Sequence, residues 1–212
     1  MENQCVFCDR NSFVERLIFE NDYLYIIASV GQIEDGYTLI IPKTHKICLG
    51  DLSDEEMIAV SNWLRRLLDA MKEEYMYEYV VLGRRPVFFE HGDVGQTIKH
   101  AHLHVVPTHV DVLSYVAKSL GEGKETASLN DLRKVRESHR YYIFCTDRLG
   151  KMFVFPVSDP EKIPRQYLRL VLAKLVGRPE RANWKTMDMG IDFTLWSSTR
   201  DRLRPYFLEG GC

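Results

Sequence analysis

The sequence predicts an α+β fold with a mainly antiparallel sheet, flanking helices and a C-terminal extension. Short runs rich in aromatic and β-branched residues, separated by glycine-containing connections, predict the strands. One long apolar stripe at helical spacing, preceded by a capping sequence, predicts the principal helix. Because the pattern changes after Pro107, we expect a domain over residues 1–110 and an α/β extension over residues 111–212, packed on that domain.

Composition limits the classes of function. A chain of 212 residues can bury a substantial core as one domain with an extension. Its 45% hydrophobic and 27% charged residues are ordinary for a globular protein, and a net charge of −2 gives no broad reason to bind nucleic acid. The N-terminus lacks a secretory signal pattern and no stretch has the apolar length of a membrane span. We therefore expect a cytoplasmic protein with neither a membrane nor a nucleic acid as its partner.

The first half of the chain predicts two strands followed by a helix. Residues 22–29 and 37–42 form an antiparallel pair punctuated by Gly31 and Gly36. The sequence from Ser53 to Glu56 has the form of a capping box, so we expect a helix to follow and to end near residue 75. The apolar stripe that should face the core consists of Met57, Val60, Leu64, Leu67, Leu68 and Met71.

Further strands and helices are expected beyond residue 78. Residues 79–82 and 86–90 are predicted as two strands, and a loop with two glycines at 92–95 leads into a strand that carries three histidines. Residues 121–125 are polar enough for a mobile loop. In the extension we expect a helix over 112–120, a hairpin from 141–145 and 152–157, and a helix over 164–176.

His100, His102 and His104 stand at alternating positions, and residues two apart on a strand share one face. The intervening residues are small or apolar, which predicts that the opposite face is buried. Imidazole is the usual general base and a common metal ligand. The three histidines therefore indicate a chemical site on one side of the sheet.

Cys5 and Cys8 form a C-x-x-C pair, and in a reducing compartment a close pair of cysteines is more often a metal site or a redox pair than a structural disulfide. Their spacing is suited to zinc, but two thiolates supply only half of a tetrahedral shell. Two free, partly buried thiols are the alternative. A redox pair would need a thioredoxin-like βαβ context, which the surrounding pattern lacks.

Residues 95–107, Gly-Gln-Thr-Ile-Lys-His-Ala-His-Leu-His-Val-Val-Pro, resemble the signature of the histidine triad (HIT) family. The hydroxyl and lysine positions resemble the fragile histidine triad branch, whose members hydrolyse dinucleoside polyphosphates. The resemblance covers roughly residues 5–107. It implies a HIT-like fold, a nucleotide or dinucleoside polyphosphate as substrate, and a homodimer.

The resemblance also assigns roles to residues of the motif. His102 would be the nucleophile that attacks the α-phosphorus and becomes a nucleotidyl-imidazole intermediate. His104 would contact phosphate oxygens, and Thr97 would lie near the bridging or leaving oxygen. Gln96 would bind phosphate, and Gly95 would let backbone N–H groups approach it. These roles make His102, His104 and Thr97 the expected catalytic residues.

Other substrate contacts are less directly indicated. His91 is a candidate for phosphate binding or proton donation, with a surface histidine as the alternative. The family often has Gly-His where this chain has Gly36-Tyr37, so one imidazole is missing. The resemblance places the nucleoside near the first strands, and a carboxylate there could accept ribose hydroxyl protons. The nucleoside candidates are Phe7, Ile18, Phe19, Asn21 and Asp22, each of which could equally be a core or turn residue.

In zinc-containing members of this family, an N-terminal C-x-x-C pair joins a histidine in a P-K-x-H segment and the first triad histidine. This chain has Cys5, Cys8, His45 in Pro42-Lys43-Thr44-His45, and His100. A closed Cys₂His₂ shell has no open position for water, so the resemblance implies structural zinc. The alternative is a direct hydrogen bond between the two histidines.

Several functions share this chemistry. A nucleotide hydrolase is our first expectation, and a phosphorylase or nucleotidyltransferase would use the same intermediate with another acceptor. A nucleotide-binding regulatory protein is the alternative from another class. In the extension, Gln166 and Arg169 lie at i, i+3 on one helix face and could bind phosphate, although a solvated helix face is the simpler interpretation. Further basic residues follow at Arg200, Arg202 and Arg204.

Overall fold

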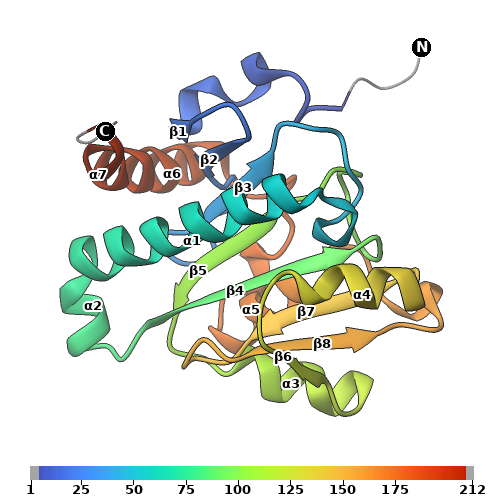
Figure 1. The fold of residues 1–212 in the computed structure, drawn as a ribbon. Helices are drawn as coiled ribbons and strands as arrows, with labels where there is room; N and C mark the ends of the chain where they lie inside the picture. The colour runs from blue at the N-terminus through green and yellow to red at the C-terminus, as the bar shows by residue number, and fades with distance from the viewer. Residues whose placement is uncertain (1–4, 209–212) are drawn as a thin grey trace.

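The computed structural model describes residues 5–208, which fold around one eight-stranded sheet (Figure 1). The strand order is β1-β2-β3-β5-β4-β7-β8-β6, and every neighbouring pair is antiparallel. The α+β class with an antiparallel sheet is therefore confirmed. The strands are β1 (Leu17–Glu20), β2 (Leu24–Ala28), β3 (Thr38–Pro42), β4 (Arg85–Gly92), β5 (Leu103–Thr108), β6 (Lys124–Thr126), β7 (Tyr142–Thr146) and β8 (Met152–Pro156).

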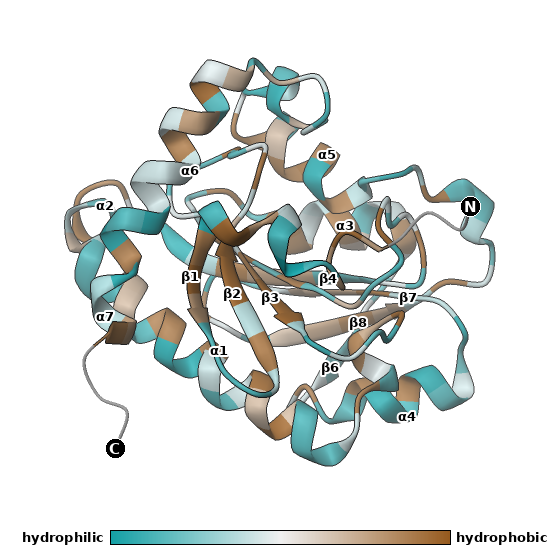
Figure 2. Ribbon diagram, turned by 90° about the horizontal axis from the view of Figure 1, so that it is seen from above, coloured by the Kyte–Doolittle hydropathy of each residue, from teal (hydrophilic) through white to brown (hydrophobic). Residues whose placement is uncertain are grey.

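Helices cover both faces of the sheet, so each face has its own apolar core (Figures 1 and 2). On one face pack α1 (Asp54–Glu74), α4 (Asp131–Ser138), α6 (Met189–Leu203) and α7 (Pro205–Leu208). On the other pack α3 (Val112–Leu120) and α5 (Tyr167–Leu175). Seen from above, brown hydrophobic strands lie between helices with teal hydrophilic residues (Figure 2). Among residues 5–208, no helix has the length and apolar character needed to span a membrane.

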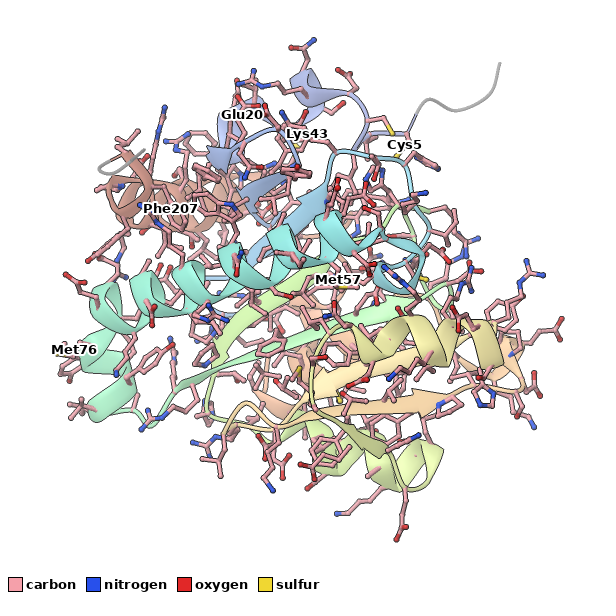
Figure 3. The ribbon with its side chains drawn as sticks, viewed as in Figure 1. Cys5, Glu20, Lys43, Met57, Met76 and Phe207 are labelled. Atoms are coloured by element: carbon pink, nitrogen blue, oxygen red, sulfur yellow. The ribbon has the colours of Figure 1, made fainter. Side chains whose placement is uncertain are left out.

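The helix α1 follows its sequence signals closely. The Ser53 hydroxyl accepts a hydrogen bond from the Glu56 N–H at 3.2 Å, and the Glu56 carboxylate accepts one from the Ser53 N–H at 2.7 Å. This reciprocal capping satisfies two N–H groups that a helix start leaves unpaired. The predicted stripe faces the sheet, with Met57 fully buried beneath the helix (Figure 3). The capping box and the stripe are thus confirmed.

Residues 79–82 were predicted as a strand, and this prediction is wrong. Residues Met76–Val80 form the short helix α2, in which the Tyr79 N–H donates to the Tyr75 carbonyl. Tyr79 is buried, whereas the three residues after it are exposed, so no alternation of buried faces exists here. Met76 also lies at the surface, at one end of the molecule (Figure 3). The β-propensity of this segment is overridden because it has no neighbouring strand.

The extension adds strands to the same sheet. β7 pairs with β4, β8 pairs with β7, and β6 pairs with β8. Residues 124–126, part of which was expected in a mobile loop, are therefore an edge strand. β4 is paired on both sides, and the strand order leaves β1 and β6 as the edges of the sheet within the described chain. The expected homodimer stays a prediction, and a dimer that joins sheets edge to edge would have to use β1 or β6.

A buried carboxyl group joins β4 to the extension. Glu90 is completely buried and accepts hydrogen bonds from the Leu49 N–H and the Tyr142 hydroxyl, both at 2.6 Å. Burial raises the pKa of Glu90 to about 7, although these two hydrogen bonds act in the opposite direction. The folded state therefore holds a proton on Glu90 at pH values where the unfolded chain has lost it.

We expect this proton to make the folded state more stable on the acidic side of pH 7. Because the pKa of Glu90 is raised on folding, its contribution to stability falls as the pH rises from about 4.5 to about 7. Glu90→Gln should remove this loss. The free energy of unfolding of the variant minus that of the original chain should therefore be about 2 kcal/mol larger at pH 8 than at pH 5.

Urea unfolding at both pH values measures this difference. Glu122→Gln, a change to an exposed carboxyl group in the loop after α3, is the matched control and should show the pH dependence of the original chain. A difference between the Glu90 variant and the original chain that stays constant from pH 5 to pH 8 would contradict the assignment.

Candidate active site

A cavity of about 280 Å³ lies on the sheet face that α5 covers, beside His102 and His104. It is formed by the N-terminal segment, the loop after β2, the loop before β5, and the extension. Nine of the candidate residues line this cavity, namely Phe7, His91, Gly95, Gln96, Thr97, His102, His104, Gln166 and Arg169. The structure therefore brings the candidate catalytic residues and most of the candidate phosphate contacts to one place.

The three alternating histidines do not all belong to the strand. β5 begins at Leu103, so His100 and His102 precede it. The small and apolar residues between the histidines are fully buried against the α1 side, as predicted from the alternation. The rings of His102 and His104 lie 4.8 Å apart between centroids. His100 turns instead toward the N-terminal cysteines, so the triad is divided between two places.

His102 has a fixed orientation and protonation pattern. Its Nδ1 lies 2.6 Å from the His100 carbonyl oxygen, and since a carbonyl can only accept, Nδ1 must donate. The lone pair of neutral His102 is therefore on Nε2. The side chain is 8% exposed, and burial lowers its pKa to about 4. The Phe7 ring packs on it in a T-shaped arrangement, with centroids 5.2 Å apart.

His104 is held by Tyr37, a residue whose role the sequence did not reveal. The Tyr37 hydroxyl lies 2.8 Å from Nδ1 of His104, and both side chains are buried. The His104 ring also stacks on Phe89, with centroids 4.6 Å apart. Burial lowers the pKa of His104 well below its usual value. A phenol that donates to Nδ1 of this neutral ring leaves the Nε2 proton available to an acceptor.

His91 is buried rather than exposed. Its Nε2 accepts a hydrogen bond from the Leu168 N–H at 3.0 Å, at the start of α5. Burial lowers the pKa of His91 to about 3, so the ring is neutral near pH 7 and its remaining proton is on Nδ1. The surface alternative is thus excluded. His91 instead connects β4 to the first turn of a helix in the extension.

The loop before β5 is also closed by the extension. Gly95 has a φ of 71°, a left-handed conformation that favours glycine, and its carbonyl accepts the Gln166 N–H at 2.7 Å. A Cβ atom at Gly95 would lie 2.9 Å from the Pro164 carbonyl oxygen. Gln96 donates from Nε2 to the Ile47 carbonyl oxygen at 2.9 Å. Both contacts fix the path of the segment that presents Thr97 to the cavity.

Four nucleoside candidates lie outside the cavity. Asn21 and Asp22 form the turn between β1 and β2, where the Asn21 side chain accepts the N–H groups of Tyr23 and Leu24. Ile18 is buried in the core on the α1 side, and Phe19 stacks on Trp63. Their positions agree with the turn and core interpretations. Of this group only Phe7 lines the cavity.

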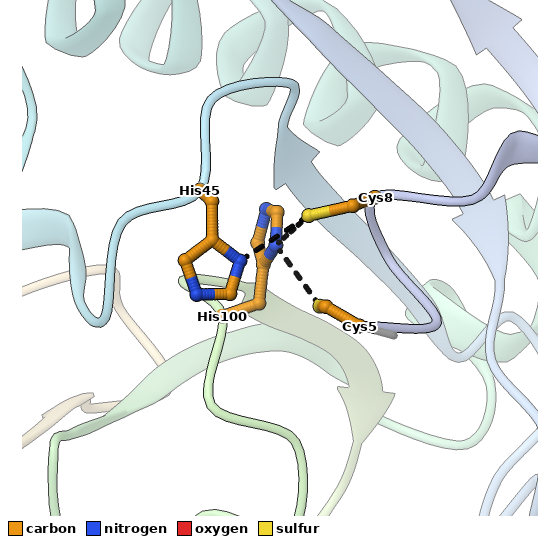
Figure 4. A group of neighbouring side chains, drawn as sticks. All are labelled: Cys5, Cys8, His45 and His100. Carbon is orange, nitrogen blue, oxygen red and sulfur yellow. Dashed lines mark hydrogen bonds between the residues drawn. The ribbon is translucent and has the colours of Figure 1, made fainter. Parts of the chain in front are cut away.

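The predicted metal ligands form a compact group near the N-terminal end of β5 (Figure 4). The ligand atoms of Cys5, Cys8, His45 and His100 all lie within 4.8 Å of one another. His100 Nδ1 is 3.4 Å from Cys5 Sγ and 3.5 Å from Cys8 Sγ, and His45 Nδ1 is 3.2 Å from Cys8 Sγ. Ligand atoms around tetrahedral zinc are separated by about 3.3–3.8 Å. The donor set and its spacing fit this metal.

A second contact orients one ligand for metal binding. Nε2 of His100 lies 2.8 Å from the Pro42 carbonyl oxygen, so the proton of neutral His100 is on Nε2. Its Nδ1 lone pair is directed at both cysteines. A backbone carbonyl commonly fixes a metal-bound histidine in this way. The group thus has two thiols, two imidazoles and one preset tautomer.

Comparisons with known proteins give matches to the first half of the chain. Residues 11–111 match the HIT domain family. We refer to this segment, by the family model that it matches, as the HIT domain. The chain is 27% identical over 110 residues to the adenosine 5'-monophosphoramidase of Saccharomyces cerevisiae, an alignment that covers 50% of this chain and 64% of that protein. A HIT family protein of Bacillus anthracis of known structure has 24% identity and a TM-score of 0.43, and the match covers 52% of this chain and 77% of that one.

One relative also covers the region beyond the HIT domain. The zinc finger CCCH domain-containing protein 64 of Arabidopsis thaliana is 26% identical over 200 residues. That alignment covers 86% of this chain and 32% of the plant protein. The HIT domain and the extension therefore align together in this case.

The extension contributes side chains to the cavity of the HIT domain. Gln166, Arg169 and Trp184 line the cavity, although they lie beyond the matched residues. The interpretation of Arg169 as part of a solvated helix face is wrong, because its side chain is 4% exposed. Arg200 and Arg202 instead pair with Asp201, Asp35 and Glu74 away from the cavity. The sequence could not distinguish the buried Arg169 from the surface arginines, because its partners Gly31 and Tyr37 lie far away in the sequence.

Proposed function

We propose that the protein is a nucleotide hydrolase that forms a covalent nucleotidyl intermediate on His102. The observation that carries the proposal is the hydrogen bond from His102 Nδ1 to the His100 carbonyl, which leaves Nε2 as a nucleophile inside the cavity. A cavity of about 280 Å³ is near the lower end of small-molecule sites, which suits one nucleotide unit. The name of the yeast relative, a monophosphoramidase, supports chemistry at a nucleoside phosphate.

The proposed reaction has two displacements. In the first, the Nε2 lone pair forms a bond to the α-phosphorus, and the bond from phosphorus to the leaving group breaks with its electron pair. In the second, water forms a bond to phosphorus, the bond to Nε2 breaks, and a nucleoside monophosphate leaves. The water gives up one proton and the leaving group gains one, so the sum is hydrolysis.

Neighbouring residues would assist the charged oxygens. With the Tyr37 hydroxyl as the donor to Nδ1, His104 would present an Nε2 proton and could donate to a phosphoryl oxygen without being charged. Thr97 has a hydroxyl that can bind the leaving oxygen, and Gln96 and Gly95 form the adjacent wall. We propose His102, His104 and Thr97 as the catalytic residues and this wall as part of the phosphate site.

The substrate proposed first is a dinucleoside polyphosphate, by the resemblance to the fragile histidine triad branch. A phosphoramidate is the second candidate, since the yeast relative carries that name. Incubation with dinucleoside tri- and tetraphosphates and with adenosine 5'-phosphoramidate, followed by rapid acid-free quenching, should yield the protein with one nucleotidyl group on His102. Peptide mass spectrometry locates that group.

The fate of the intermediate distinguishes the alternatives. Release of a nucleoside monophosphate with or without inorganic phosphate supports a hydrolase. Formation of a nucleoside diphosphate when phosphate is present would identify a phosphorylase, which uses the same intermediate. If no substrate of the panel turns over and nucleotides bind unchanged, the protein is a nucleotide-binding regulator and the proposal is wrong.

Tyr37→Phe should lower kcat by about 10-fold with a much smaller effect on KM. The change removes the hydroxyl that holds His104, and a buried imidazole nitrogen without its partner costs about 1–1.5 kcal/mol. Tyr37→His should recover part of the loss, since an imidazole can also donate to Nδ1. Equal kcat values for the phenylalanine variant and the original chain would show that this contact has no part in turnover.

The proposal includes zinc at Cys5, Cys8, His45 and His100, where it would have a structural role. Four protein ligands leave no position for a reacting group. When bound, the metal would join the N-terminal segment, the loop after β3 and the segment before β5. The His100 carbonyl that orients His102 belongs to this last segment, so the metal group and the nucleophile share one stretch of backbone.

A further inference from the structure

The cavity carries positive charge without a carboxylate on its wall. Its lining includes two arginines, Arg16 and Arg169, and no aspartate or glutamate among the described residues. His91 and His104 also line it, and burial lowers the pKa of both, so neither adds charge near pH 7. A buried charge is costly unless an opposite charge accompanies it. The composition of the wall therefore favours an anionic ligand.

Of the two arginines in the cavity wall, Arg16 has a carboxylate, that of Asp192, in its surroundings. Its Nη1 donates to the Ala28 carbonyl oxygen at 3.0 Å, and the Asp192 carboxylate favours its charged form. Asp192 itself accepts the N–H groups of Gly31 and Gln32 at 2.7 and 3.2 Å. The charge of Arg16 is thus partly balanced within the protein.

Arg169 has no such balance. Its Nε donates to the Ala182 carbonyl at 3.1 Å, and its Nη2 donates to the carbonyls of Gly31 and Arg181 at 2.7 and 3.2 Å. No carboxylate lies within ion-pair distance of Arg169 in residues 5–208. The three carbonyls fix the guanidinium in place but carry no formal charge, and the Tyr37 hydroxyl, a further hydrogen-bond partner of Arg169, is likewise uncharged.

The fixed guanidinium lies next to the histidine end of the cavity. Its central carbon is 5.2 Å from the centre of the Tyr37 ring, and the Tyr37 hydroxyl contacts His104. Arg169 also packs closely on the loop after β2, because a Cβ atom on Gly31 would lie 2.6 Å from Arg169 Nη2. An anion that reaches His102 and His104 therefore enters the surroundings of Arg169.

We propose that Arg169, supplied by α5 of the extension, is a substrate-binding residue for the phosphoryl group of a nucleotide. This deepens the proposed function, on which it rests for the identity of the ligand. The phosphoryl oxygens provide the missing negative charge, and a guanidinium binds them with geometric preference over an ammonium group. The HIT domain therefore depends on the extension for part of its affinity.

Binding of reaction products tests this without turnover. AMP, GMP, CMP and UMP are titrated calorimetrically into the full chain, each beside its uncharged nucleoside. Arg169→Met should weaken the best monophosphate by about 10-fold or more and its nucleoside by less than about 2-fold. Arg169→Lys should retain part of the preference for the monophosphate. Lys174→Met, which removes an exposed cation of the same helix, should leave both affinities unchanged.

The outcomes separate binding from structure and from chemistry. Equal weakening of the nucleoside and the monophosphate would show that Arg169 only supports the loop at Gly31, and an unchanged preference would show that it does not bind the phosphoryl group. Absence of binding of all four monophosphates to the original chain would also overturn the proposal. The nucleotidyl group on His102 is measured separately, so its absence would contradict the proposed reaction and leave the result on Arg169 standing.

Discussion

His102→Ala should reduce nucleotide turnover by a factor on the order of 10⁴ or more with the fold intact. The nucleophile of a two-step displacement has no substitute in the cavity, because Tyr37 occupies Nδ1 of His104, and Leu168 occupies Nε2 of His91. The proposed intermediate could not form. Single-turnover assays with the best substrate of the panel measure the loss, and circular dichroism with thermal unfolding establishes that the variant is folded.

A matched variant makes the result specific. His139→Ala removes an exposed histidine at the end of α4 that does not line the cavity, and this variant should retain full turnover. His102→Ala should still bind the monophosphate product, since Arg169 and His104 are kept. Turnover by the His102 variant within about 10-fold of the original chain would rule out covalent catalysis by this residue.

Loss of the metal group should cost stability rather than chemistry. The purified protein is expected to contain one zinc ion per chain, and Cys8→Ser or His100→Ala should reduce that content to near zero. A ligand that binds only the folded state adds about 4 kcal/mol to the free energy of unfolding when its free concentration is 1,000 times its Kd. We expect a decrease of that order for either variant, measured by urea unfolding with zinc quantified by mass spectrometry.

Controls separate the metal group from the nucleophile. Cys48→Ala changes a buried cysteine that lies outside the cluster and should leave the zinc content unchanged. His102→Ala should likewise keep its zinc. If His100→Ala and His102→Ala lose zinc equally, the division of the three histidines into a metal ligand and a nucleophile is wrong.

The sequence predicted those elements that are determined by neighbouring residues or by a regular apolar pattern. The capping box at Ser53 and Glu56 and the stripe of α1 describe one helix, so short-range spacing was sufficient. Residues 79–82 have aromatic and β-branched side chains, but a strand needs a neighbour that the sequence of the segment does not contain. The three-residue strand β6 exists only because β8 lies beside it, which no pattern within 121–125 could indicate.

The candidate site shows the same limit. The histidine motif and the C-x-x-C pair pointed to side chains that the structure does bring together, because motif spacing reflects the local backbone. Asn21 and Asp22 were nucleoside candidates because the resemblance places the nucleoside near the first strands, but they form the turn between β1 and β2 and do not line the cavity. Arg169 could not be distinguished from a surface arginine, because its partners at Gly31 and Tyr37 lie more than a hundred residues away.

The pairing of β4 with β7 has a consequence for the order in which the molecule is made. The three histidines of the motif, together with Cys5, Cys8 and His45, have been synthesised by residue 104, but the second strand that flanks β4 arrives only at residues 142–146. The contacts to His91 and Gly95 arrive later still, with Gln166 and Leu168. A growing chain can therefore bring the cysteines and histidines of this group together early, whereas the wall of the cavity is completed only after residue 184 has been added.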